Sequence, residues 1–137
     1  MEDLELRPYL CIWAAGFLDG EARFGLAAHH FGPVARIEVV QKVSAPLELL
    51  QRLFGGHVRP RQVPRFKEVY WHWGLTRKAD VKRLLEETIP WLVVKRRQAE
   101  LLLEAVQIAP YDPEARIRKD ELYLEVRMLN ARRTPIA

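Results

Sequence analysis

The longest apolar run of the chain covers residues 9–18 and ends at the pair Asp19-Gly20. This run is too short to cross a bilayer, for which about 20 residues are needed. Pro8 suits the first position of a helix and Asp19-Gly20 suits its end, so we expect a helix here. Because the helix is apolar all round, it has to be covered on more than one side.

Two arrangements can cover such a helix in a small chain. One side can rest on the chain's own sheet, and a copy of the same helix from a second subunit can cover another. Ala14, Ala15 and Gly16 would let two helix backbones come close in that two-fold contact. Alternatively, the chain's own C-terminal helices wrap around it. The residues alone favour neither arrangement.

After this helix the sequence alternates between apolar and polar residues, which is the period of a half-buried strand. Phe24 and Leu26 share the apolar side, the chain turns at Gly32-Pro33, and Ile37 continues that side in a second strand. The same alternation over residues 57–61 and 69–75 predicts a second hairpin, with Trp71 and Trp73 on its inward side.

Helical spacing separates and follows the two hairpins. A helix begins near Ser44 and Pro46 and stops at Gly55-Gly56. Further helices are predicted over about 78–87, 91–109 and 113–130, with Pro90 between the first two. The order helix-hairpin-helix-hairpin-helix (αββαββα) indicates an α+β fold with an antiparallel sheet, helices on one face and the other face left to solvent or a ligand.

Composition limits the class of protein. The 137 residues suit one domain, 1–137, and 49% hydrophobic residues exclude a disordered chain. A single cysteine, Cys11, excludes an intrachain disulfide and a cysteine-based zinc site, which suggests an intracellular protein. The acidic start Met1-Glu2-Asp3 is unlike a secretory signal or a transit peptide, and no membrane span is expected. The net charge of +4 and the pI near 9.5 make nucleic acid a partner worth testing.

Residues 14–22, Ala-Ala-Gly-Phe-Leu-Asp-Gly-Glu-Ala, resemble the signature of the LAGLIDADG homing endonucleases, in which a helix ends at a Gly flanked by acidic residues. Ala14 stands where that family usually has Leu, and Ala22 where it usually has Gly, which adopts backbone angles that Ala disfavours. A second stretch, residues 90–99, resembles the family's Pro, aromatic and Leu followed by a Lys ahead of a Gln-Ala helix.

This resemblance implies a fold, an assembly and an activity. Members with one motif are homodimers, which favours two packed copies of the first helix, and their sheet forms a DNA-binding saddle. They cut both strands of a long, roughly two-fold symmetric DNA target with divalent metal ions, so we expect Mg²⁺ or Mn²⁺ as cofactor. We expect an intracellular location, in the cytoplasm or nucleoid, with an organelle as the alternative. By resemblance Glu21 is the metal ligand. Asp19 is expected to be a polar end of the helix.

The resemblance also implies two further catalytic residues. Lys95 aligns with the family's active-site lysine, a cation that can stabilise charge on a phosphate; its alternative role is one of three solvated cations with Arg96 and Arg97. Gln41 aligns with a residue that orients active-site water, although strict alternation would turn it inward, so we expect a bulge or a strand end there. The family's Arg shortly after that Gln is absent, and its role is vacant or passes to Lys42.

The outward side of the predicted sheet carries hydrogen-bonding side chains, as a surface that reads the major groove requires. Arg59 and Arg61 lie two residues apart on one face and are the strongest candidates for contacts to guanine. Arg65 and Lys67 in the connecting loop are expected to contact phosphates. The expected DNA-binding set is Arg23, His29, Arg36, Glu38, Arg59, Arg61, Arg65, Lys67, Tyr70 and His72.

Two other functions remain open at this point. A nucleic-acid binder of the same fold that does not cleave, such as a maturase or a regulator, would use the same sheet face. An interaction domain without nucleic acid ranks last. The dependence of DNA affinity on salt, and cleavage with and without Mg²⁺, distinguish the three.

Overall fold

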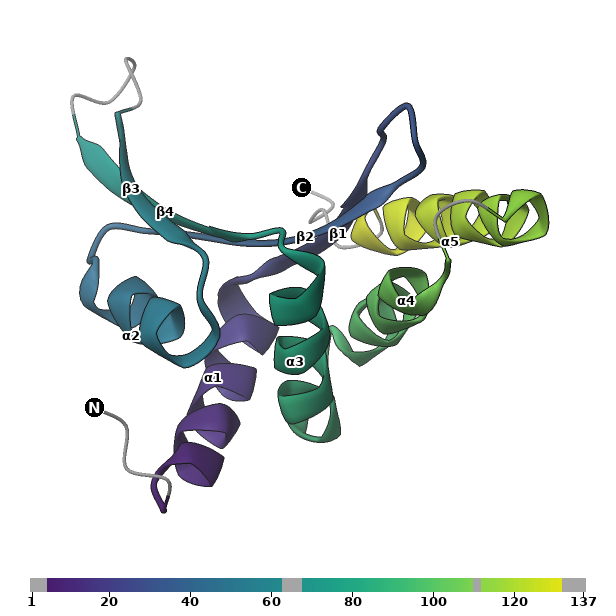
Figure 1. The fold of residues 1–137 in the computed structure, drawn as a ribbon. Helices are drawn as coiled ribbons and strands as arrows, with labels where there is room; N and C mark the ends of the chain where they lie inside the picture. Colours follow the sequence, from purple (N-terminus) through teal and green to yellow (C-terminus); the bar gives the residue numbers. More distant parts are fainter. Residues whose placement is uncertain (1–4, 63–67, 110–111, 132–137) are drawn as a thin grey trace.

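The computed structural model describes residues 5–62, 68–109 and 112–131. Its elements follow the predicted order and confirm the α+β class (Figure 1). They are α1 (Arg7–Glu21), β1 (Arg23–Ala27), β2 (Val34–Gln41), α2 (Ala45–Phe54), β3 (His57–Gln62), β4 (Val69–Leu75), α3 (Lys78–Thr88), the short 3₁₀ helix η1 (Ile89–Trp91), α4 (Arg96–Gln107) and α5 (Pro113–Ala131).

The two hairpins form one antiparallel sheet in the order β1-β2-β4-β3, in which β2 and β4 join them at the centre. Glu38 of β2 stands opposite Arg23 on one side and opposite Gly74 on the other. In Figure 1, α1 to α4 lie below the sheet, α5 runs beneath the β1-β2 hairpin, and the two hairpins rise at either end. The free face of the sheet is therefore a concave saddle.

The alternation of the strands places their apolar residues against the helices. Phe24, Ile37 and Trp73 are almost completely buried, and the indole N–H of Trp73 donates to the carbonyl oxygen of Gly55 at 2.9 Å. Gly56 has a positive φ of 87°, and a Cβ there would lie 2.5 Å from the Gly74 carbonyl oxygen. Only glycine fits that turn between α2 and β3.

Two predicted helix boundaries are wrong. Residues 92–95 are not helical, so the predicted helix over 91–109 is replaced by η1, a bent non-helical segment and α4. The reason is a distant partner, because backbone N–H groups of this segment donate to the carboxylate of Asp19. The first helix also continues beyond Asp19-Gly20 to Glu21, and the N–H of Ala22 still donates to the Leu18 carbonyl at 2.9 Å.

Among the described residues, the neighbours of α1 cover one of its sides. It packs against β2, α3 and η1, and Ala14 and Ala15 are fully buried there. The expectation that Ala14 and Ala15 face a second copy is therefore wrong, whereas Gly16 is exposed. The uncovered side of α1 consists of Tyr9, Ile12, Trp13, Gly16 and Gly20. Within the described ranges, no helix combines the length and the apolar character needed to cross a membrane.

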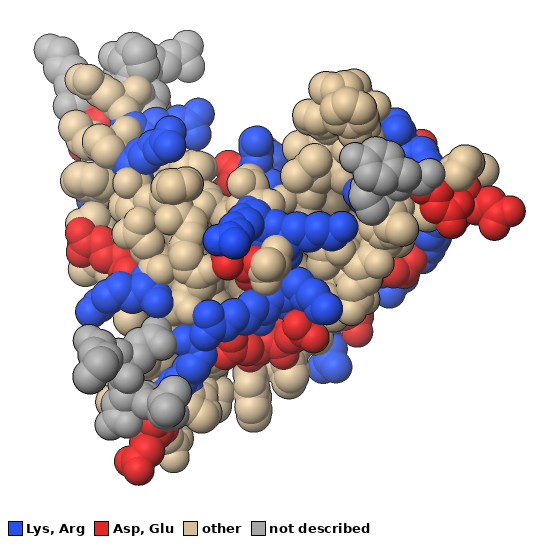
Figure 2. Space-filling model, viewed as in Figure 1, with Lys and Arg blue, Asp and Glu red and all other residues tan. Residues whose placement is uncertain are grey.

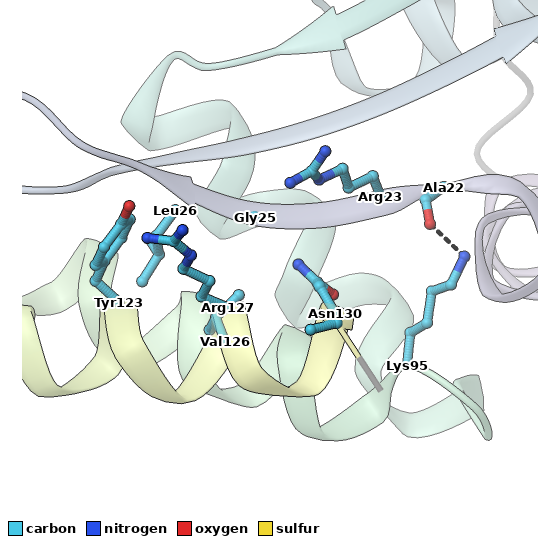
Figure 3. Close-up of a pocket in the computed structure, with 10 residues that line it drawn as sticks. Ala22, Arg23, Gly25, Leu26, Lys95, Tyr123, Val126, Arg127 and Asn130 are labelled. Carbon is cyan, nitrogen blue, oxygen red and sulfur yellow. Dashed lines mark hydrogen bonds between the residues drawn. The ribbon is translucent and has the colours of Figure 1, made fainter. Parts of the chain in front are cut away.

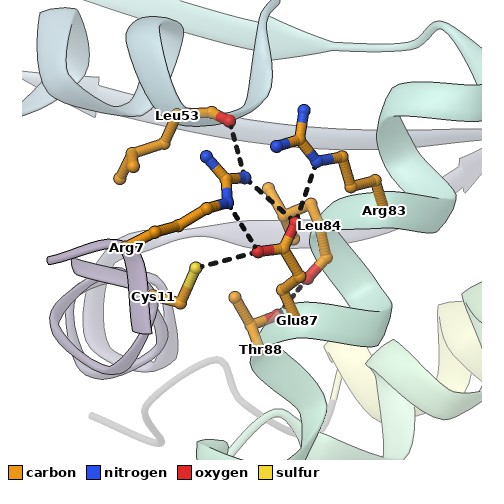
Figure 4. Close-up of polar contacts among 7 residues, drawn as sticks. All are labelled: Arg7, Cys11, Leu53, Arg83, Leu84, Glu87 and Thr88. Atoms are coloured by element: carbon orange, nitrogen blue, oxygen red, sulfur yellow. Dashed lines mark hydrogen bonds and ion pairs between the residues drawn. The ribbon is translucent and has the colours of Figure 1, made fainter. Parts of the chain in front are cut away.

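A group of polar contacts fixes the N-terminal half of α1 to its neighbours (Figure 4). The Glu87 carboxylate of α3 accepts hydrogen bonds from Arg7 at 2.9 and 3.0 Å and from the Cys11 thiol at 3.1 Å. Arg7 also donates to the carbonyl of Leu53, so the group joins α1, α2 and α3. Burial, followed by the adjacent Glu87, raises the pKa of the Cys11 thiol to about 11.

Candidate functional site

The carboxylate of Glu21 lies exposed at the C-terminal end of α1. The side-chain amide of Gln41 donates to its Oε2 at 2.8 Å. Gln41 is the last residue of β2 and stays in register with Trp71 of β4, so β2 has no bulge at this point. From the end of the strand, the Gln41 side chain reaches the C-terminal end of α1. The fold thus brings together two of the predicted catalytic residues.

Asp19 of α1 connects this helix to the segment that precedes α4. Both of its oxygens accept hydrogen bonds of 2.8 to 3.0 Å from consecutive backbone N–H groups, those of Val93, Val94 and Lys95. Burial alone would raise the pKa of Asp19, but these backbone donors and the nearby Lys95 outweigh burial and lower it. The carboxylate is engaged in holding the segment before α4, which agrees with the expected structural role of Asp19.

Lys95 is buried, with 4% of its surface exposed, whereas Arg96 and Arg97 are exposed. Its ammonium donates to the carbonyl oxygens of Ala22 and Leu18 at the last turn of α1. Those carbonyls form the negative end of the helix dipole, so a cation is favourable there. The side chain therefore does not belong to a solvated run of cations.

Two departures from the family's pattern, Ala22 in the motif and the missing Arg after Gln41, have different outcomes. Ala22 has φ −86° and ψ 152°, an ordinary extended conformation, so alanine replaces the usual glycine without backbone strain. Lys42 forms an ion pair with Glu68 at 3.3 Å and lies 5.8 Å from the ring centroid of Tyr70. The contacts of Lys42 are thus directed to the second hairpin.

The residues at the end of α1 fit a divalent metal ion only in part. In the described part of the chain, no group of three or more His, Cys, Asp and Glu side chains could hold a metal. Glu21 offers one exposed carboxylate, and hard oxygen donors are those that Mg²⁺ and Mn²⁺ prefer. Mg²⁺ is usually bound by one or two carboxylates together with phosphate oxygens. One chain supplies one such carboxylate here, so the donor set fits if a second copy and DNA complete it.

The saddle carries the polar side chains that alternation predicted. At its centre, Glu38 contacts His72 at 3.1 Å and Arg36 at 3.5 Å. A hollow of about 290 Å³ is lined by these three residues together with His57 and Arg59. Figure 2 shows the upper edge of the molecule hollowed between the hairpins, with Lys and Arg side chains at the floor and on the left wall. Arg23, Arg61 and Tyr70 also belong to the free face, by their place in the strand register.

One predicted contact residue, His29, does not lie on the free face of the sheet. His29 follows the end of β1 at Ala27 and stacks on His30 in the turn, with ring centroids 4.3 Å apart. It is off the sheet because β1 is shorter than its alternating pattern suggested. Arg65 and Lys67 lie outside the described residues.

Sequence reasoning missed two contributions to the site. His57 shares the face of Arg59, and the period of two in β3 could have found it. A pocket of about 690 Å³ lies between β1 and α5 and reaches Ala22 and Lys95 (Figure 3). Tyr123, Arg127 and Asn130 of α5 point into it, and no sequence signal connects that helix with Glu21.

Comparison with solved structures finds the same fold in homing endonucleases. The homing endonuclease I-CvuI in complex with its target in the presence of Ca gives a TM-score of 0.76 at 21% identity, covering 96% of this chain and 88% of that one. The archaeal intron-encoded homing endonuclease I-Vdi141I complexed with DNA gives 0.75 at 16% identity, covering 88% and 84%. The LAGLIDADG meganuclease I-AabMI bound to uncleaved DNA gives 0.65 at 17% identity, covering 85% of this chain and 43% of that one.

Comparison of the sequence with models of protein families and with curated proteins finds no match. The structural comparisons and the topology together establish the fold. The chain has the fold of the LAGLIDADG homing endonucleases.

Proposed function

We propose that this protein is a site-specific DNA endonuclease that works as a homodimer and uses divalent metal ions, Mg²⁺ or Mn²⁺. The carrying observation is the exposed Glu21 carboxylate, held by Gln41, at the end of a helix whose outer side is uncovered. Solved proteins of this fold are homing endonucleases, several of them in complexes with DNA. Each copy would read one half of a long, roughly two-fold symmetric target and cut one strand.

The uncovered side of α1 supports a dimer. Gly16 and Gly20 are exposed and lie about one helical turn apart on one face, and a Cβ at either position would meet nothing within 4 Å. Ile12 and Trp13 continue the same side as exposed apolar residues. Two copies of α1 can therefore approach closely, which would bring their Glu21 residues together at the two-fold axis. The 43% coverage of I-AabMI agrees with one chain forming half of an enzyme.

The residues at the end of α1 would then divide the work. Glu21 of each copy would hold divalent ions together with phosphate oxygens, and such ions polarise phosphate and lower the pKa of bound water. Gln41 fixes the orientation of the Glu21 carboxylate through its 2.8 Å hydrogen bond. Lys95 keeps a positive charge at the last turn of α1, where charge on a phosphate can be stabilised.

The saddle would supply sequence recognition. Arg59 and Arg61 project from one face of β3, and each could form paired hydrogen bonds to a guanine edge, worth about 1–3 kcal/mol of discrimination. Glu38 adds an acceptor at the centre, where Arg36 and His72 hold it. Donors and acceptors in alternating positions match the pattern of the major groove.

Selection of cleaved sites from a randomised duplex pool, with Mg²⁺ or with a chelator, tests this function. We expect cleavage at symmetric sites with Mg²⁺ only. Glu21→Gln should keep DNA affinity and lose cleavage, whereas Glu86→Gln, which removes an exposed carboxylate of α3, should cleave normally. Tight, salt-sensitive binding without breaks at any site would instead identify a non-cleaving binder. Full activity of Glu21→Gln would exclude Glu21 from the metal site.

A further inference from the structure

The pocket between β1 and α5 is strongly cationic. The described residues that line it include Arg23, Lys95 and Arg127 and no Asp or Glu. Figure 3 shows Arg127 and Asn130 reaching from α5 toward β1, with Lys95 at the other end of the pocket. A volume of about 690 Å³ is ample for a phosphate with its adjoining sugar. Its chemistry therefore suits an anion.

Two of these cations have no carboxylate partner in the described part of the chain. Neither Arg23 nor Arg127 forms an ion pair there, although both lie in elements with well-defined neighbours. Other arginines of the same helix differ, because Arg116 pairs with Asp120 at 3.2 Å and Arg118 pairs with Glu104 at 2.6 Å. Both side chains are exposed, so an anion in the pocket can reach their guanidinium groups without first breaking an ion pair.

The pocket is placed next to the end of α1. Ala22, the residue after Glu21, lines the pocket, and its carbonyl oxygen accepts a hydrogen bond from the Lys95 ammonium group. Asn130 fixes the C-terminal turn of α5 to β1 through a 2.9 Å hydrogen bond to the Phe24 carbonyl. Gly25 of β1 has no side chain to fill the space, and a Cβ there would meet only Arg23, at 3.9 Å. The pocket is therefore a fixed feature that opens beside the candidate cleavage site.

We propose that this pocket binds a backbone phosphate of the DNA, with Arg127 of α5 and Arg23 of β1 as its phosphate-binding residues. The inference rests on the proposed function and extends it to a helix outside the saddle. Two guanidinium groups can donate several hydrogen bonds to phosphate oxygens. Contacts of this kind carry no sequence information, but they fix the register of the strand. The bound phosphate would hold the strand beside Glu21.

The test measures the affinity for a fluorescent DNA duplex of fixed, arbitrary sequence as a function of salt, in a chelator so that nothing is cut. Each phosphate contact adds about 0.9 to the slope of log affinity against log salt. Arg127→Ala should lower that slope by about one, so that its loss of affinity between about 50 and 200 mM salt is about threefold smaller than for the wild type. Arg127→Lys keeps the charge and should keep most of the slope.

Arg116→Ala is the matched control, because it removes the same charge from the same helix about 16 Å nearer its N-terminus. Its slope should equal that of the wild type. If the wild type binds the duplex and Arg127→Ala keeps the full slope, the phosphate pocket is refuted while the proposed function stands. If the wild type shows no salt-dependent binding, the proposed function fails and the pocket's assignment fails with it. Binding of inorganic phosphate that depends on Arg127, with duplex affinity unchanged, would make this a small-anion site and overturn the proposal.

Discussion

Replacing Gly16 by Leu separates the stability of the chain from the stability of its dimer. Gly16 lies inside α1, where glycine costs about 0.5–1 kcal/mol relative to a good helix former. A Cβ at this position meets nothing within 4 Å in the single chain. The folded monomer should therefore gain about 0.5–1 kcal/mol in its free energy of unfolding.

The dimer should respond in the opposite direction. If the Gly16 side of α1 faces a second copy, each leucine adds its side chain to a contact between two backbones. Overpacking costs about 1–3 kcal/mol per site, or about 2–6 kcal/mol for the two copies, which corresponds to at least 25-fold weaker association. Gly16→Ala gives nearly the same helix stabilisation with a much smaller obstruction, so it should dimerise better than the leucine variant.

Light scattering over a micromolar dilution series, with urea unfolding of the same samples, measures both quantities. A leucine variant that dimerises as tightly as the wild type would refute the assignment of this face. So would a wild type that remains strictly monomeric at micromolar concentration.

Three further changes test the internal contacts. Asp19→Asn should lower the free energy of unfolding by about 1–2 kcal/mol. Because the folded pKa of Asp19 is lowered, its carboxylate stabilises the fold above the unfolded pKa of about 3.9, and this stabilisation is lost as the pH falls through the folded pKa. Urea unfolding should therefore show that the variant loses less stability than the wild type below about pH 4. An equal loss in both proteins would contradict the assignment. Cys11, with its pKa raised to about 11, should react with iodoacetamide at pH 8 more than about 100-fold more slowly than an exposed thiol. Denaturant should restore the rate of an exposed thiol. Rapid labelling of the folded protein would contradict the raised pKa. Trp73→Phe removes the donor to the Gly55 carbonyl and should lower the free energy of unfolding by about 1–2 kcal/mol in urea, so an unchanged value would mean that this bond contributes nothing.

The sheet could be predicted from the sequence because each strand has one buried and one exposed face. Phe24 and Ile37 are buried, and Arg36 and Glu38 lie on the other face, as their alternation indicates. Local breakers such as Gly55-Gly56 also ended their helix as predicted. Both signals depend only on residues that are neighbours in the sequence, so they could be interpreted without knowledge of the tertiary structure.

The parts that escaped prediction depend on distant partners. Asp19 holds the non-helical segment at residues 92–95 through backbone N–H groups. Almost every residue has such a group, so the sequence does not show which ones Asp19 contacts. Lys95 stands beside Arg96 and Arg97 in the chain, yet only Lys95 is buried, because the end of α1 lies over it. The pocket lined by both Arg127 and Ala22 combines residues from distant parts of the chain, and no periodicity encodes it.

The residues of the saddle and those of the hydrophobic core lie on opposite faces of the same strands. Arg59 and Arg61 are exposed, whereas Trp73 of the neighbouring strand is buried beneath the sheet. Substitutions on the free face therefore cost the chain little folding energy. If the free face reads DNA as we propose, such proteins can change their recognition sequences through these positions while the scaffold stays intact, and the same positions can be randomised by design.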